Sequence, residues 1–76
     1  MRDFLTFMIK GIVDYPDQII LDQQQENDKI VSNLQVAKDD VGKVIGKQGR
    51  NAMALRVLLG AMAAKEGKRA WLEIAD

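Results

Sequence analysis

The sequence has 76 residues and a mass of 8.5 kDa, enough for a single domain, residues 1–76, with a thin core. Apolar residues make up 47% of the chain and charged residues 29%, a balance typical of a globular fold and not of a disordered segment. Eleven basic and eleven acidic residues give a formal net charge of zero, whereas nucleic-acid-binding domains are usually basic.

The sequence contains no cysteine and no histidine. These absences exclude disulfides, thiol nucleophiles, the common zinc sites and imidazole acid–base catalysis, so we expect no metal and no cofactor. A serine nucleophile could only be Ser32, and there is no histidine to activate it. We therefore expect that the protein is not an enzyme.

No run of residues approaches the ~20 apolar positions that a membrane span requires. Asp3, Lys10 and Asp14 interrupt what would otherwise resemble the apolar part of a secretion signal. We therefore expect a cytoplasmic protein with no membrane association.

The first predicted element is an amphipathic helix. Its apolar residues recur at i, i+1, i+4, i+5, i+8 and i+9, which places them on one stripe that can pack against a core. We expect this helix to end at residues 15–17, because proline disfavours helical backbone in the residue before it. The stripe consists of Phe4, Leu5, Met8, Ile9, Ile12 and Val13.

A hairpin of two strands is predicted next. Ile19 and Leu21 fall on one side of an extended segment over residues 18–25, and residues 26–28 are turn formers. Apolar and polar positions alternate again over residues 30–36, as in a half-buried strand.

The second half of the chain predicts two helices and a strand. The aspartates at residues 39–40 can cap a short helix that starts at Val41. A long apolar helix follows over residues 50–65, and Gly67 is suited to end it. Residues 70–74 alternate as a final strand.

A helical crossover between the second and last strands implies that these two strands are parallel. We therefore predict an α+β fold of two layers, a three-stranded mixed sheet with three helices packed on one face.

The most informative segment is the loop between the two helices of the second half. Gly46 can leave the short helix with a positive φ, and Gly49 removes a side chain where the long helix begins. The start of that helix is a natural anion site, and Lys43, Lys47 and Arg50 surround it with positive charge. This arrangement suits a phosphodiester, although a plain helix–turn–helix corner with surface lysines would show the same residues.

A nucleotide-binding P-loop does not fit the same segment. The run from Gly42 to Gln48 is one residue too short, and Gln48 stands where the Mg²⁺-binding hydroxyl is needed.

The segment D-D-V-G-K-V-I-G-K-Q-G-R, residues 39–50, closely resembles the KH domain of RNA-binding proteins. The helix and strand that precede the core motif resemble the type II arrangement of bacterial KH domains. Together with the closing E-G-K-R-A-W-L-E-I, the whole chain is similar to the KhpA family of small stand-alone bacterial KH proteins. Two positions depart from that pattern, Ser32 at a core-facing strand position and Ala52 where KH domains often carry isoleucine.

The resemblance implies a single-stranded RNA-binding protein whose G-x-x-G loop clamps the backbone of about four nucleotides. It would act as an RNA chaperone or post-transcriptional regulator. The clamp would be Gly46, Lys47, Gln48 and Gly49, reinforced by Lys43 and Arg50, with Val44 and Ile45 as an apolar floor and Lys68 and Arg69 at the other rim.

Trp71 alternates onto the outer face of the predicted sheet. It is either an ordinary, partly buried strand residue or a contact for a base or a partner.

The long helix is apolar nearly all round, so it carries a second apolar stripe besides the one that faces the sheet. Ala52, Leu55, Leu59 and Met62 can face the sheet, and the second stripe has the i, i+3, i+4, i+7 spacing of a helix seam. We predict a symmetric homodimer through this seam unless the first helix covers it. The resemblance also implies a heterodimer with a larger KH protein of the KhpB/Jag type. The seam consists of Ala54, Val57, Leu58 and Ala61.

Two functions therefore remain in view, RNA binding at the loop and a protein-interaction adaptor that works through the seam. The charge distribution favours the first. Residues 1–42 hold four basic and eight acidic residues, whereas residues 43–76 hold seven basic and three acidic residues. The net charge of zero is thus the sum of an acidic first half and a basic second half, and the basic half begins next to the loop.

Overall fold

The alternating residues in the middle of the chain form the predicted hairpin in the computed structural model, which describes residues 2–75. β1 (Ile20–Glu26) pairs antiparallel with β2 (Lys29–Gln35), and the pair Glu26 and Lys29 leaves a turn of two residues. Asn27 in that turn has a φ of 53°, a conformation that asparagine tolerates better than most residues. The strand begins later than predicted, because Pro16–Gln18 forms a turn of 3₁₀ helix first.

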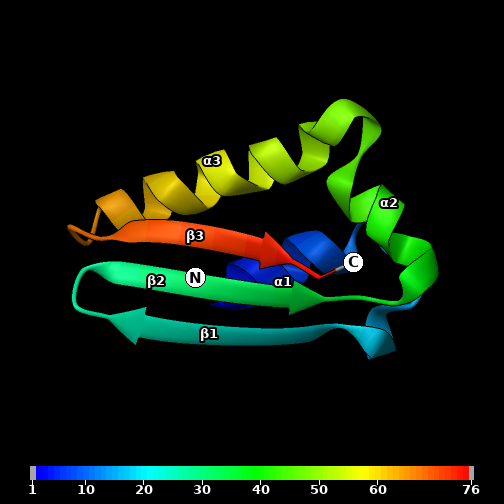
Figure 1. The fold of residues 1–76 in the computed structure, drawn as a ribbon, viewed down its shortest axis with the longest axis horizontal. Coiled ribbons are helices and arrows are strands. Elements are labelled where there is room, and N and C mark those ends of the chain that lie inside the picture. The colour runs from blue at the N-terminus through cyan, green and yellow to red at the C-terminus, as the bar shows by residue number, and fades with distance from the viewer. Residues whose placement is uncertain (1, 76) are drawn as a thin grey trace.

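The last strand confirms the predicted parallel pair. β3 (Arg69–Ile74) lies parallel to β2, and the strand order is β1-β2-β3 (Figure 1). The crossover between β2 and β3 contains α2 (Val41–Ile45) and α3 (Arg50–Ala64). The observed fold is therefore the predicted α+β arrangement with a mixed sheet, consistent with a KH domain.

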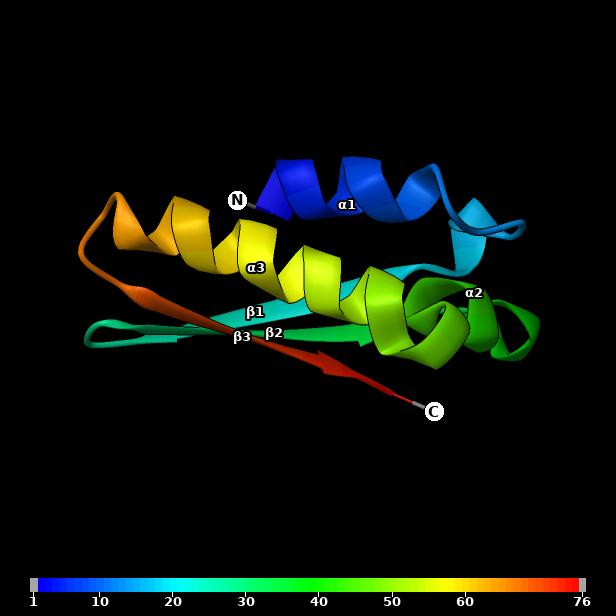
Figure 2. The same cartoon turned by 90° about the horizontal axis from the view of Figure 1, so that it is seen from above.

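Helices cover one side of the sheet and leave the other side open (Figure 2). α1 (Arg2–Lys10) and α3 lie on the covered side, and α2 lies at one end of the sheet. Among residues 2–75, the model contains no helix with the length and apolar character needed to cross a membrane. The core between the helices and the sheet consists of Leu5, Ile9, Val13, Leu21, Leu34, Val36, Val44, Leu55, Leu59 and Leu72.

The buried face of α3 is close to the predicted one. Ala52, Leu55 and Leu59 are buried as expected, but the last buried position is Ala63, and Met62 is only half-buried. The fourth residue of α3 that packs against the sheet is therefore one position later in the chain than predicted.

The two small residues that depart from the KH pattern are both buried. Ser32 is 1% exposed, and its hydroxyl accepts a hydrogen bond of 2.9 Å from Nε2 of Gln23, its partner across the sheet. Ala52 is 4% exposed. The buried hydroxyl is therefore satisfied, which avoids the cost of an unpaired polar group in the core.

α1 ends earlier than the sequence predicts. The helix ends at Lys10 and not at residues 15–17. The N–H groups of residues 11–13 still donate to carbonyls of the last helical turn, but beyond them the two carboxylate oxygens of Asp40 accept the backbone N–H groups of Asp14 at 3.0 Å and Tyr15 at 2.9 Å. These N–H groups are therefore bound by a distant side chain and not by the preceding turn of a helix.

The same contact corrects the predicted cap. α2 begins at Val41, as expected, but the side chain of Asp40 makes no capping hydrogen bond to it. Asp40 is fully buried, and it joins the segment after α1 to the start of α2. Lys43, with its Nζ 3.9 Å from the Asp40 carboxylate, supplies a nearby positive charge.

Replacement of Asp40 by asparagine tests this junction. The amide oxygen can accept one of the two N–H groups, but the charge and the second acceptor are lost, so we expect the free energy of unfolding to fall by about 2 kcal/mol. Urea denaturation followed by circular dichroism measures the change. Asp39→Asn, at an exposed neighbouring position, is the control and should change stability by less than about 0.5 kcal/mol. Equal stability of the two variants would contradict the role of Asp40.

Candidate nucleic-acid interface

The GKQG loop, residues 46–49, joins α2 to α3 through an unusual backbone conformation. Gly46 has a φ of 78°, Gln48 of 56° and Gly49 of 75°. Glycine adopts positive φ at little cost, but for Gln48 the left-handed conformation costs about 1 kcal/mol. Backbone held in a sparsely populated conformation is concentrated at functional sites, so this loop is the first candidate site of the molecule.

Asn51, in the first turn of α3, closes the loop on itself. Its Nδ2 donates a hydrogen bond of 2.9 Å to the carbonyl oxygen of Lys43 in α2. A Cβ atom added to Gly46 would lie 2.7 Å from Cγ of Asn51, so this position has no room for a side chain. Gly46 is therefore required both by its φ and by the close approach of Asn51. No local pattern in the sequence marks Asn51, because only the folded corner brings it back to α2.

Gly49 has a different role from Gly46, because nothing lies within 4 Å of a Cβ atom added there. No side chain caps the start of α3 at Gly49. The N–H of Arg50, the first residue of this 15-residue helix, donates to the carbonyl oxygen of Lys47, and the positive end of the helix dipole lies beside an open surface. This geometry suits an oxyanion that approaches the backbone closely.

The polar side chains of the loop point to solvent. Lys47, Gln48 and Arg50 are exposed, and within residues 2–75 neither Lys47 nor Arg50 forms an ion pair. Both charges are thus available to a ligand at the start of α3.

Lys43 is less free than the sequence suggests. Its ammonium group forms a hydrogen-bonded ion pair with the carboxylate of Asp14. This hydrogen bond raises the pKa of Lys43 above its ordinary value, and the charges of Asp14 and Asp40 raise it further. Lys43 therefore stays protonated at neutral pH, but a phosphate near it must compete with Asp14.

The two residues of the predicted apolar floor differ in their burial. Val44 is fully buried in the core and has no surface to offer a base, so the prediction that it lies under RNA bases is wrong. Ile45 is half-buried and lies at the end of α2 next to the loop. In a helix of five residues, the sequence does not show which of two adjacent apolar side chains faces the core.

Lys68 and Arg69 lie at the opposite end of α3 from the GKQG loop. A helix of 15 residues is about 22 Å long, so these cations and the loop do not form one local cluster. Arg69 also forms an ion pair of 3.7 Å with Asp28. The structure therefore does not bring the two predicted rims together.

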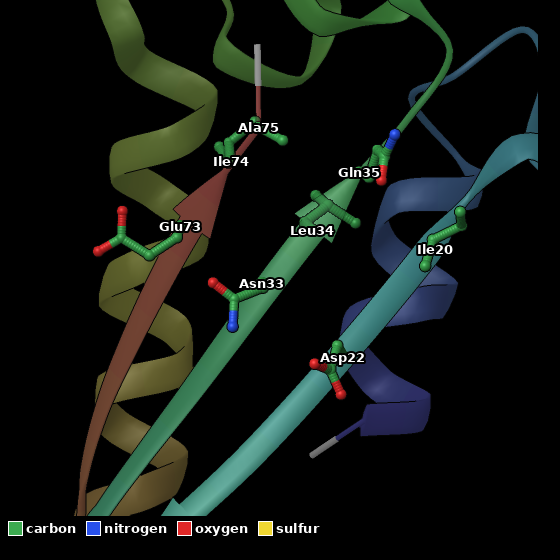
Figure 3. A pocket seen from close by; sticks show the side chains of 8 residues that line it. All are labelled: Ile20, Asp22, Asn33, Leu34, Gln35, Glu73, Ile74 and Ala75. Atoms are coloured by element: carbon green, nitrogen blue, oxygen red, sulfur yellow. The ribbon is translucent and has the colours of Figure 1, made fainter.

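The uncovered face of the sheet is unsuited to phosphate at one end. Figure 3 shows Asp22, Asn33 and Glu73 next to one another on β1, β2 and β3, around a hollow of about 390 Å³. Two of these three side chains are carboxylates, and they would repel a nucleic-acid backbone.

Trp71 occupies the other part of that face and is 38% exposed. Nζ of Lys29 lies 4.6 Å from the centroid of its ring, and Cζ of Arg69 lies 5.5 Å from it. These cation–π contacts cover part of the ring and leave the rest of it exposed.

The predicted seam of α3 is exposed in the monomer, so the alternative that the first helix covers it is wrong. Val57 is 65% exposed and Leu58 is 40% exposed, and Ala54 and Ala61 are also exposed. The molecule therefore has two separate candidate surfaces, the basic loop and an apolar helix face.

Comparisons with known proteins identify the family. A family model described as the KH domain of KhpA/KhpB matches residues 2–74. Curated relatives named "RNA-binding protein KhpA" include one from Chlamydia trachomatis, 40% identical over 100% of this chain and 97% of the relative. Another, from Clostridium acetobutylicum, is 43% identical over 97% of this chain and 99% of the relative.

A third, from Listeria monocytogenes, is 36% identical over the full length of both chains. These relatives are named for RNA binding and not for a catalysed reaction, in agreement with the expectation that the chain is not an enzyme. No solved structure shows a significant match. The matching family model, the full-length relatives and the GKQG corner between α2 and α3 together show that this chain belongs to the KhpA/KhpB family of KH domains.

Proposed function

We propose that this protein binds single-stranded RNA by holding its sugar–phosphate backbone at the GKQG loop. The observation that carries the proposal is the start of α3, which no side chain caps and which lies next to the exposed charges of Lys47 and Arg50. The names of its relatives support the same ligand.

Phosphate contacts fix the position of a strand but do not read its sequence. The contacts available at the loop are a helix start, two cations and the amide of Gln48, all of which suit phosphate oxygens. Recognition of particular RNAs must therefore come from other parts of the protein or from assembly with a second KH domain.

The exposed seam supports the proposal of a symmetric homodimer. An apolar stripe on one helix, open in the monomer, can pack against its own copy across a two-fold axis. The description of the family model, which covers both KhpA and KhpB, also supports a heterodimer with a KhpB/Jag-type protein. We further propose that the dimer acts in the cytoplasm as an RNA chaperone or post-transcriptional regulator.

A protein-interaction adaptor is the second candidate function, and the exposure of Val57 and Leu58 is the observation that favours it. In that case the seam would bind a partner protein directly, and the loop would make no functional contact. Capture of a partner that depends on Leu58, survives nuclease treatment and is unaffected by changes at Lys47 would favour the adaptor.

The double variant Lys47→Asp with Gln48→Asp tests RNA binding. Two carboxylates beside the start of α3 repel phosphate, so we expect the affinity for a single-stranded RNA, measured by fluorescence anisotropy, to fall by at least about 100-fold. Both side chains are exposed, so the melting temperature should change little.

The matched control carries Gln25→Asp and Lys65→Asp. These residues are also exposed and give the same change of charge, but they lie at the opposite end of α3 from the loop. We expect this control to lose only a few-fold in affinity, by long-range electrostatics. Unchanged RNA retention by the loop variant, or an equal loss in both variants, would contradict the loop as the RNA-binding site.

The variant Leu58→Asp tests the dimer. A carboxylate at the centre of the seam would be buried without a partner in the dimer, so sedimentation velocity should show a monomer where the unaltered protein is a dimer. Gln24→Asp, on the uncovered face of the sheet, should leave the dimer intact. If the unaltered protein already sediments as a monomer at micromolar concentration, the homodimer proposal fails.

A further inference from the structure

The edge of the sheet beside α3 carries hydrogen-bonding groups that β2 does not use. The N–H of Arg69 donates to the Asp28 carbonyl at 2.7 Å, and that of Ala75 donates to the Leu34 carbonyl at 2.9 Å. Since peptide groups alternate in direction along a strand, the odd-numbered residues of β3 face β2. Leu72, at an even position, therefore directs its N–H and C=O groups to the free edge, as do its two even-numbered neighbours.

Arg56 covers the middle of this edge. Its Nε and Nη2 atoms both lie 3.3 Å from the carbonyl oxygen of Leu72, and its side chain is otherwise exposed. A guanidinium group has more N–H donors than one carbonyl oxygen can accept, so donors remain available to a ligand. Arg56 also lies between the GKQG loop at one end of α3 and Lys68 at the other.

The neighbours of Arg56 on α3 leave room for a flat group. Met53 and Gly60 lie three residues before and four residues after Arg56, on the same side of the helix. Met53 is 65% exposed, and nothing lies within 4 Å of a Cβ atom added to Gly60. Along α3, Arg56 therefore has the apolar side chain of Met53 on one side and the open space above Gly60 on the other.

We propose that Arg56 is a base-reading residue of the RNA site and that it selects cytosine or guanine over adenine. The inference rests on the proposed function, because it assumes that the RNA backbone is held at the GKQG loop. A guanidinium group presents parallel N–H donors, which match a base edge with two adjacent acceptors.

Cytosine presents its carbonyl oxygen next to an unprotonated ring nitrogen, and guanine does the same on its major-groove edge. Adenine places an amino group beside its ring acceptor, so one donor of Arg56 would face another donor. The carbonyl of Leu72 holds the guanidinium group in place and lowers the entropy lost when a base binds. Together these features give the site a chemical preference that phosphate contacts cannot supply.

Binding of short RNAs to the full-length protein tests the inference. The probes are fluorescein-labelled hexamers of uridine in which one central base is cytosine, guanine or adenine, and the readout is anisotropy. We expect the unaltered protein to bind the cytosine or guanine probe about tenfold more tightly than the adenine probe. Arg56→Lys keeps the charge but loses the paired donors, and it should reduce this ratio to less than about twofold.

Arg50→Lys is the matched control, since it makes the same exchange at the loop. It should weaken binding of every probe alike and leave the ratio unchanged. If Arg56→Lys keeps the affinity ratio of the unaltered protein, the inference is overturned. If it loses affinity equally for every probe and has a lower melting temperature, the inference is also overturned and Arg56 is a structural residue. Equal binding of all three probes by the unaltered protein would also overturn it and leave the proposed function standing. If the protein binds none of the three probes, both the inference about Arg56 and the proposed function are overturned.

Discussion

The buried carboxylate of Asp40 is the interaction on which the position of the loop depends. It is fully buried and holds the N–H groups of Asp14 and Tyr15, so the segment that leaves α1 is joined to the residue just before α2. Because α2 has only five residues, any shift of its first residue would move the GKQG loop by a similar amount. A thin two-layer domain has few other contacts with which to fix so short a helix.

From this junction, the corner between α2 and α3 is built by two opposite uses of glycine. Gly46 has no room for a side chain, because Asn51 reaches past it to the carbonyl of Lys43. Gly49 has open space around it and leaves the start of α3 uncovered. The first glycine makes the loop rigid and the second makes it accessible, which are the two properties that a preorganised anion site requires.

Local patterns in the sequence predict most of the fold, because strand alternation, helix periodicity and glycine positions each act over a few residues. These patterns predict that β2 and β3 are parallel, and they predict where the GKQG loop lies in the chain. Asp40, Asn51 and Arg56 could not be assigned in this way, since each side chain binds a backbone group that only the tertiary fold brings near. The buried position of Val44 was missed for the same reason.

The central claim is that the loop binds RNA through phosphate charges, and the salt dependence of affinity tests it most directly. If Lys47 and Arg50 each neutralise one phosphate while Lys43 stays paired with Asp14, log affinity for a single-stranded RNA should fall with log salt at a slope of roughly −1.4. Lys47→Ala should make the slope shallower by about 0.7. A slope near zero, or the same slope in both proteins, would contradict the account.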